Sequence, residues 1–348
     1  MKSSLVGPVL FPRLALILPL LATACGGRLD PADTGEAVSP APVSAPSATT
    51  PFPSGTIAVG AEFNGATFYP RGAVADTPPL GQLTWSIAQY APQYLAFDAA
   101  GALYVDSYLA EEDAGATPSA RVDVFAPGSV GSSSPVRTIM GPQTGLVSTR
   151  AMVVDSHGYL YVANGSAHPG ANTPSTVSVF APDATGDIAP VRVIMNGLTR
   201  TLWLPCGLAL SESGSLFVSD SEPDSVDLFP SSASGQTVPS ATIGSFTAVA
   251  DSTGIALGGG FLYVADWESN DVAIFDPNGE DAGAPVGVIA GDQTMLGSPD
   301  DIAVDADGRI LVANQNTGLT VFAPGASGNV APVTVIQPAD AYNVAVMP

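Results

Sequence analysis

The segment PDDIAVDADGRILVAN, residues 299–314, and the segment LTVFAPGASGNVAPVTVI, residues 319–336, together contain four short apolar runs. Short runs that are rich in β-branched residues and bounded by Asp, Asn, Gly or Pro predict strands joined by tight turns. Apolar residues do not recur at helical spacing between the runs, so the segment does not predict a helix. The runs are Ile302–Val304, Ile310–Val312, Leu319–Phe322 and Val333–Ile336.

The same unit recurs along the chain. Earlier copies have an apolar run, a glycine turn, a second run of the type Leu-Tyr-Val-Ala-Asn and a third of the type Val-x-Val-Phe-Ala-Pro. A period near 50 residues with four strands in each unit is typical of a β-propeller, in which each unit forms one blade. The turn glycines are about 46 to 57 residues apart, and they are Gly101, Gly158, Gly214, Gly260 and Gly308.

The two ends of the repeated region complement one another. Residues 342–346 resemble a first strand with nothing after it, whereas residues 55–59, 66–70 and 79–85 resemble second, third and fourth strands without a first. We therefore predict an all-β fold over residues 55–348: a six-bladed β-propeller with four antiparallel strands in each blade. The C-terminal strand would join the N-terminal blade, which removes the exposed edges of an open array.

The N-terminal residues 1–24 predict a secretory signal peptide. Lys2 and Arg13 precede an apolar stretch that is too short for a membrane span, and small residues follow it. Cys25 directly after them resembles a bacterial lipobox, which implies a lipid-modified mature N-terminus, and Gly26 resembles the signal for outer-membrane sorting. Ordinary cleavage and secretion is the alternative. Residues 25–54, rich in Ala, Pro, Ser and Thr, predict a disordered tether.

The charge balance excludes several classes of partner. The chain has 10 basic and 32 acidic residues, a net charge of −22, and no lysine after Lys2. Nucleic acids and anionic lipid surfaces are bound through clusters of Lys and Arg, so neither is an expected partner. We expect a monomer in the bacterial cell envelope that meets the membrane only through its lipid, as a periplasmic or surface-exposed lipoprotein.

The motif Pro-x-x-Ile-Ala-Val-Asp-x-x-Gly, followed by Leu-Tyr-Val-Ala-Asp/Asn and Val-x-Val-Phe-Ala-Pro, resembles the NHL-repeat propellers and in part the gluconolactonase-like ones. The resemblance implies a divalent metal over the channel, held at one recurrent position before each first strand. Only Asp300 among the matching residues is an ordinary ligand of a hard metal ion such as Ca²⁺, so we assign no catalytic residues and no cofactor. The matching residues are Gln93, Arg150, Cys206, Thr253, Asp300 and Tyr342.

The same positions also predict a ligand-binding mouth at one end of the channel. Arg150 in this mixed polar ring would suit a small ligand with a carboxylate, although an internal Arg150–Asp300 pair that seals the channel is the alternative. Two long loops, residues 107–120 and 165–175, would overhang the mouth. The predicted ligand-binding set is Gln93, Arg150, Thr253, Asp300, Tyr342, Trp267 and His168.

The remaining polar motifs predict structure rather than a site. His157 and the Asp305-Ala306-Asp307-Gly308 segment belong to turns on the opposite face, where Asp bonds its own backbone and Gly supplies positive φ. Asn or Asp ends the second strand of the repeats, as at Asn164 and Asn314, and would cap the turn that follows. The sequence thus predicts a binding or scaffolding module for an unknown protein or small molecule. A metal-assisted lactonase or lyase is the alternative.

Overall fold

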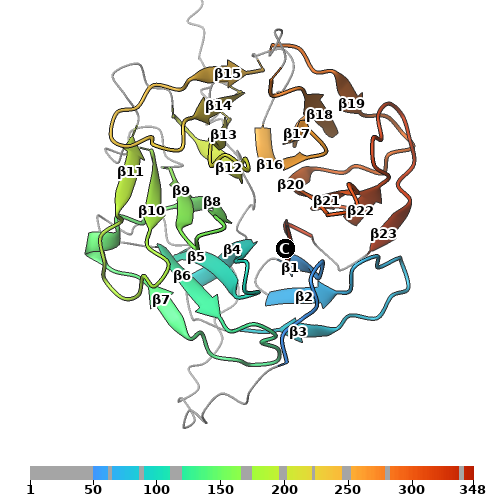
Figure 1. Cartoon of the computed structure of the whole chain (residues 1–348). Coiled ribbons are helices and arrows are strands. Elements are labelled where there is room, and N and C mark those ends of the chain that lie inside the picture. The colour runs from blue at the N-terminus through green and yellow to red at the C-terminus, as the bar shows by residue number, and fades with distance from the viewer. Residues whose placement is uncertain are drawn as a thin grey trace, which may run out of the picture.

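A computed structural model of the chain shows six four-stranded antiparallel sheets arranged as blades around a central channel (Figure 1). It describes residues 50–61, 65–85, 90–109, 120–165, 175–195, 202–221, 224–244, 252–278, 283–336 and 341–348, with only the backbone at 90–93, 108–109 and 252. Within these residues the one helix is a 3₁₀ turn, η1 (Pro142–Thr144), and no helix is long and apolar enough to cross a bilayer. The predicted fold class is confirmed.

The blades follow one another along the chain, and the first strand of each lies nearest the centre. Blade 1 comprises β4 (Tyr90–Phe97), β5 (Leu103–Leu109), β6 (Ala120–Phe125) and β7 (Arg137–Ile139). Blade 2 comprises β8 (Thr149–Val154), β9 (Leu160–Asn164), β10 (Thr176–Phe180) and β11 (Arg192–Met195). Blade 3 comprises β12 (Pro205–Leu210), β13 (Leu216–Asp220), β14 (Ser225–Phe229) and β15 (Ala241–Ile243).

The second half of the ring repeats the arrangement. Blade 4 comprises β16 (Ser252–Gly258), β17 (Phe261–Asp266), β18 (Asp271–Phe275) and β19 (Gly287–Ile289). Blade 5 comprises β20 (Pro299–Val304), β21 (Ile310–Asn314), β22 (Gly318–Phe322) and β23 (Thr334–Ile336). Blade 6 combines both ends of the chain, namely β24 (Asn343–Val346), β1 (Ile57–Ala61), β2 (Gly65–Tyr69) and β3 (Gly81–Leu83).

The C-terminal strand closes the ring as predicted. β24 pairs antiparallel with β1, so that Val344 lies opposite Val59 and Val346 opposite Ile57. Just before β1, the Gly55 amide donates to the Met347 carbonyl at 2.9 Å. The segment that leads in from residue 50 therefore reaches the ring at the end where the first strands finish.

The hydrophobic core consists of six wedges, one between each pair of adjacent blades. The third strand of every blade contributes a phenylalanine whose side chain is at most 1% exposed. These side chains follow from the Val-x-Val-Phe pattern, because alternate residues of a strand face the same neighbouring blade. The six residues are Phe68, Phe125, Phe180, Phe229, Phe275 and Phe322.

The turns between first and second strands lie on the face opposite the predicted mouth and have the predicted chemistry. Asp305 Oδ1 accepts hydrogen bonds from the amides of Asp307 and Arg309, both at 2.9 Å, and Gly308 has a φ of 78°. His157 is exposed in the equivalent turn, where its amide donates to Asp155. Local backbone bonding explains these carboxylates without a bound ion.

Glycines in the connections to the fourth strands join neighbouring blades at the periphery. Gly131, Gly186, Gly235 and Gly328 each form an isolated parallel bridge to the fourth strand of the preceding blade. All four have positive φ, between 61° and 80°, which glycine adopts at no steric cost. Each such bridge covers part of an outer strand edge that would otherwise be exposed.

Candidate functional site

A β-bulge occurs at the mouth end of the first strand in blades 1 to 5. Between paired residues the first strand has one residue more than the second strand, for example at Arg150, between Thr149 and Ala151, and at Asp300, between Pro299 and Asp301. Bulges change the direction of a side chain and are frequent beside functional sites. The bulges contain Gln93, Arg150, Cys206, Thr253 and Asp300, the positions that the resemblance indicates.

Arg150 and Asp300 are both buried at the mouth, with 7% and 4% of their surfaces exposed. Asp300 Oδ2 accepts a hydrogen bond from Gln315 Nε2 at 3.1 Å. The charges of both residues influence the pKa of the Tyr94 hydroxyl, which belongs to a buried residue of β4. Burial raises the pKa of Tyr94 well above its usual value, the Asp300 carboxylate adds to the rise, and Arg150 opposes it. The structure therefore brings two of the predicted residues together around Tyr94.

Thr253 is buried in the bulge of blade 4, where its hydroxyl bonds to the main chain. It is 1% exposed, and its hydroxyl donates to the carbonyls of Ala265 at 3.2 Å and Pro299 at 3.0 Å. The bond to Pro299 joins blade 4 to blade 5. Tyr342 is partly buried beside the start of β24, where its amide donates to Gly60 at 3.1 Å.

Two members of the predicted set lie outside the described side chains. Gln93 belongs to β4, but its side chain is among those that are not described, and His168 lies in the undescribed part of the loop after β9. The same holds for the centres of both long loops, residues 110–119 and 166–174. Their predicted roles in binding stay predictions.

Trp267 occupies the turn between β17 and β18 on the mouth face, and its side chain is partly buried. Asp266 and Asp271 lie opposite one another on either side of this turn. Burial raises the pKa of Asp271 to about 6, and the neighbouring Asp266 carboxylate contributes to the rise. Asn270 Oδ1 accepts the Ser298 amide at 2.6 Å, which connects the turn to the loop entering β20.

The recurrent Asn and Asp at the ends of the second strands are structural, but they mostly do not cap the turn that follows. Asn164 Oδ1 accepts the amides of Val147 at 2.9 Å and Ser148 at 3.1 Å, both in the loop that enters the first strand. Asp220 binds its entering loop in the same way. Asp266, which accepts the Ser269 amide at 2.9 Å, does cap its own turn. The predicted structural role of these side chains is therefore correct. The predicted hydrogen-bond partner is mostly wrong, because the fold of the blade places the loop that enters the first strand beside them.

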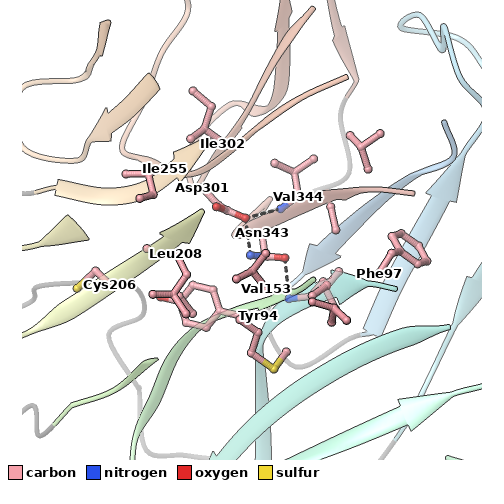
Figure 2. A pocket seen from close by; sticks show the side chains of 18 of the residues that line it. Tyr94, Phe97, Val153, Cys206, Leu208, Ile255, Asp301, Ile302, Asn343 and Val344 are labelled. Carbon is pink, nitrogen blue, oxygen red and sulfur yellow. Dashed lines mark hydrogen bonds between the residues drawn. The ribbon is translucent and has the colours of Figure 1, made fainter. Parts of the chain in front are cut away.

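A hydrogen-bonded chain of buried and partly buried groups crosses three blades on one side of the channel (Figure 2). Asp301 Oδ2 accepts Asn343 Nδ2 at 2.5 Å and the Val344 amide at 3.0 Å, and Asn343 Oδ1 accepts the Leu95 amide at 2.8 Å. The chain binds β24 to β20 on one side and to β4 on the other. Burial raises the pKa of Asp301 to about 7, although the Val344 amide bond lowers it.

The channel contains a cavity of about 260 Å³. Its wall is formed by the first strands of all six blades, and most of its side chains are aliphatic or aromatic. Tyr94, Cys206, Asp301 and Asn343 supply its polar side chains, and Asp301 is the one Asp or Glu side chain among the described residues of the lining. Figure 2 shows Tyr94 from β4 and Asp301 from β20 among the side chains around this space.

Sequence reasoning missed Tyr94, Asp301 and Asn343, which lie one residue after the predicted positions Gln93, Asp300 and Tyr342. The sequence did contain a signal for these three residues. At the same position blades 2 to 4 have only Ala or Gly, so Tyr, Asp and Asn depart from the repeat there, whereas the next position is apolar in every blade. It also missed Trp203, which is 44% exposed in the loop that enters β12. That tryptophan has no counterpart in the other repeats.

The mouth residues do not fit the divalent metal that the gluconolactonase resemblance implies. A hard cation needs several convergent oxygen ligands, but Arg150 supplies a positive charge and the Thr253 hydroxyl already donates to two carbonyls. Among the described residues no three of His, Cys, Asp and Glu are grouped so as to hold a metal ion. On the opposite face, Asp305 and Asp307 form salt bridges with Arg309 and Arg71.

Comparison with known proteins identifies the fold and does not identify a family. No family model matches the sequence, and no curated protein matches it. Solved structures match over most of the chain at low sequence identity. A chain of a nidogen–laminin complex has a TM-score of 0.60 at 12% identity, covering 84% of this chain and 98% of that one.

Two bacterial structures are similar to about the same degree. A protein of unknown function from Bacteroides caccae has a TM-score of 0.59 at 9% identity, covering 85% of this chain and 99% of that one. A proposed 6-phosphogluconolactonase from Bacteroides fragilis has a TM-score of 0.56 at 15% identity, covering 86% and 99%. The β-propeller fold is thus shared by proteins whose descriptions differ, and identities this low support the fold alone.

Proposed function

We propose that this protein is a binding module of NHL-like type, anchored in the bacterial cell envelope by a lipid on Cys25, which binds its ligand at the channel mouth. The observation that carries the proposal is the chemistry of the bulges. Five blades share one backbone distortion at the mouth, yet the residue in the bulge differs from blade to blade: Gln93, Arg150, Cys206, Thr253 and Asp300. A purely structural role would favour one residue type, as it does where Asp98, Asp155 and Asp305 take the same place in three turns of the opposite face.

The path of the chain supports an outward-facing mouth. Residues 50–56 approach β1 at the face opposite the mouth, where Phe52 packs on Phe68 with ring centroids 4.6 Å apart. A tether from Cys25 would therefore reach the ring on the side away from the mouth. An anchored propeller with this geometry presents the mouth to the aqueous compartment rather than to the bilayer.

A thermal-shift screen of the whole mature protein against a small-molecule library tests the binding role. Each compound that raises the midpoint would be measured again on Arg150→Ala and Trp267→Ala, with His157→Ala on the opposite face as the matched control. We expect each mouth variant to change the affinity at least about tenfold, or about 1.4 kcal/mol, and the control to bind normally. Binding that is indifferent to both mouth variants would contradict the assignment.

Membrane fractionation of cells tests the anchor separately. We expect the wild-type protein and Cys206→Ala in the membrane fraction and Cys25→Ser in the soluble fraction, because stable attachment needs the acyl chains. The lactonase or lyase alternative predicts a tightly bound divalent ion, which elemental analysis of the purified protein would detect. No observation in the described residues favours that alternative.

A further inference from the structure

We propose that the channel cavity binds a small ligand that has a protonated amino group and an apolar body, a deepening that rests on the function proposed above. The proposal differs from the carboxylate ligand that Arg150 suggests when the sequence is considered alone. It depends on which groups line the cavity, on the sum of the charges around Tyr94 in its wall, and on the acceptor capacity of one carboxylate.

The cavity wall is chemically divided. Its hydroxyl, carboxylate and amide side chains are gathered on blades 1, 5 and 6, at Tyr94, Asp301 and Asn343. Most of the other side chains in the lining are apolar, such as Leu208 and Ile255 from blades 3 and 4 (Figure 2). A cavity of about 260 Å³ lined in this way suits a compact apolar body with one polar end, because a few placed polar groups fix the orientation of a bound ligand.

The sum of the charges at the mouth favours a cation. Three carboxylates act on the Tyr94 hydroxyl and raise its pKa, namely those of Asp300, Asp106 and Asp301, whereas one guanidinium, that of Arg150, lowers it. An anionic ligand would meet this excess of negative charge in a site of low dielectric, where charges interact strongly. The chain as a whole, with a net charge of −22, also attracts cations.

Asp301 can accept a further donor. The bonds from Asn343 and Val344 both go to Oδ2, and an ionised carboxylate has lone pairs on both oxygens. Oδ1 lies directly over Gly254, where an added Cβ would be only 2.4 Å away. Oδ1 therefore packs against Gly254, and any larger residue at that position would displace the carboxylate.

Protonation of Asp301 should couple to binding. Its pKa of about 7 means that the carboxylate is divided between its two forms at neutral pH. An ammonium group pairs with the ionised form, so affinity for an amine should rise about tenfold between pH 6 and pH 8. The facing ionisable groups are Asp300 beside it, Arg150 from β8, and Tyr94 and Asp106 from β4 and β5.

Titration calorimetry with three probes of matched shape tests the proposal on the whole mature protein: cyclohexylmethylamine, cyclohexylmethanol and cyclohexanecarboxylate. We expect the amine to bind at least about tenfold more tightly than either of the others at pH 8 and to lose that advantage at pH 6. Asp301→Asn should abolish the preference. Asp227→Asn, which replaces a buried carboxylate on β14 whose pKa burial also raises, is the matched control and should leave it intact.

A second variant covers the case in which Asp301→Asn disturbs the ring. Val153→Phe would fill part of the cavity while it retains Asp301, and we expect it to prevent binding of all three probes. Tighter binding of the alcohol or the carboxylate would overturn the amine proposal and leave the proposed mouth function standing. Binding of no probe by the wild-type protein at millimolar concentration would also overturn it. If the amine binds and Arg150→Ala and Trp267→Ala have no effect, the channel site stands and the mouth assignment fails.

Discussion

The two faces of the ring differ in how closely the blades repeat one another. On the face of the first turns, Asp98, Asp155 and Asp305 make the same pair of bonds to amides two and four residues further on. On the mouth face, one shared bulge displays Arg150 in one blade and Asp300 in another. The comparison teaches that folding constrains the first face residue by residue, whereas on the second it constrains only the backbone.

The largest expected effect belongs to the repeated core between the faces. Phe322→Ala should lower the free energy of unfolding by about 3 to 5 kcal/mol, because the phenyl side chain is fully buried and its removal leaves a cavity. Chemical denaturation followed by circular dichroism measures the change. The effect should concern stability alone, so the folded fraction should retain the ligand affinity of the wild-type protein. A loss below about 1 kcal/mol would mean that the wedges between blades 4 and 5 tolerate voids.

The next effect concerns the mouth side, where Asp301 joins the closing strand to its neighbours. Its pKa is about 7 in the folded protein and about 3.9 in an unfolded chain. The folded state binds this proton more tightly, so the contribution to stability is complete below pH 4, falls as the pH rises toward 7 and is constant above that. At about 1.4 kcal/mol for each pKa unit, the fall has an upper bound of about 4 kcal/mol.

Denaturation across pH 4 to 8 compares the wild-type protein with Asp301→Asn and Asp271→Asn. Asp301→Asn should remove the decrease in the free energy of unfolding between pH 6 and pH 7, together with the share of Asp301 in the decrease below pH 6. Asp271→Asn should change only the part below about pH 6, since the pKa of Asp271 is about 6. Identical curves for the wild-type protein and Asp301→Asn would show that the carboxylate does not titrate within the fold.

The smallest effect sharpens the comparison on the turn face. Gly308 has a φ of 78°, so Gly308→Ala should cost about 1 to 2 kcal/mol through backbone strain. His157→Ala in the equivalent turn of blade 2, where the side chain is exposed, should stay within about 0.5 kcal/mol. Thermal midpoints measure both. A larger cost for His157→Ala would indicate that this face carries more than turn geometry.

Much of the fold could be predicted because its determinants are local. A strand of the type Leu-Tyr-Val-Ala-Asn and a turn with glycine at positive φ are specified within a few residues. Repetition at a near-constant period then gave the number of blades, and the incomplete units at the two ends gave the closure between β24 and β1. The mouth positions could be located for the same reason, since each has a fixed place before a first strand.

The sequence by itself thus determined the architecture, the closing strand and the line of bulge residues, because each depends on a pattern that recurs within one blade. Only the tertiary structure decided what surrounds the channel. Tyr94, Asp301 and Asn343 belong to three different blades and meet because the ring brings their first strands together. Their charges and hydrogen bonds depend on distances between residues far apart in the chain, and no local pattern encodes those distances.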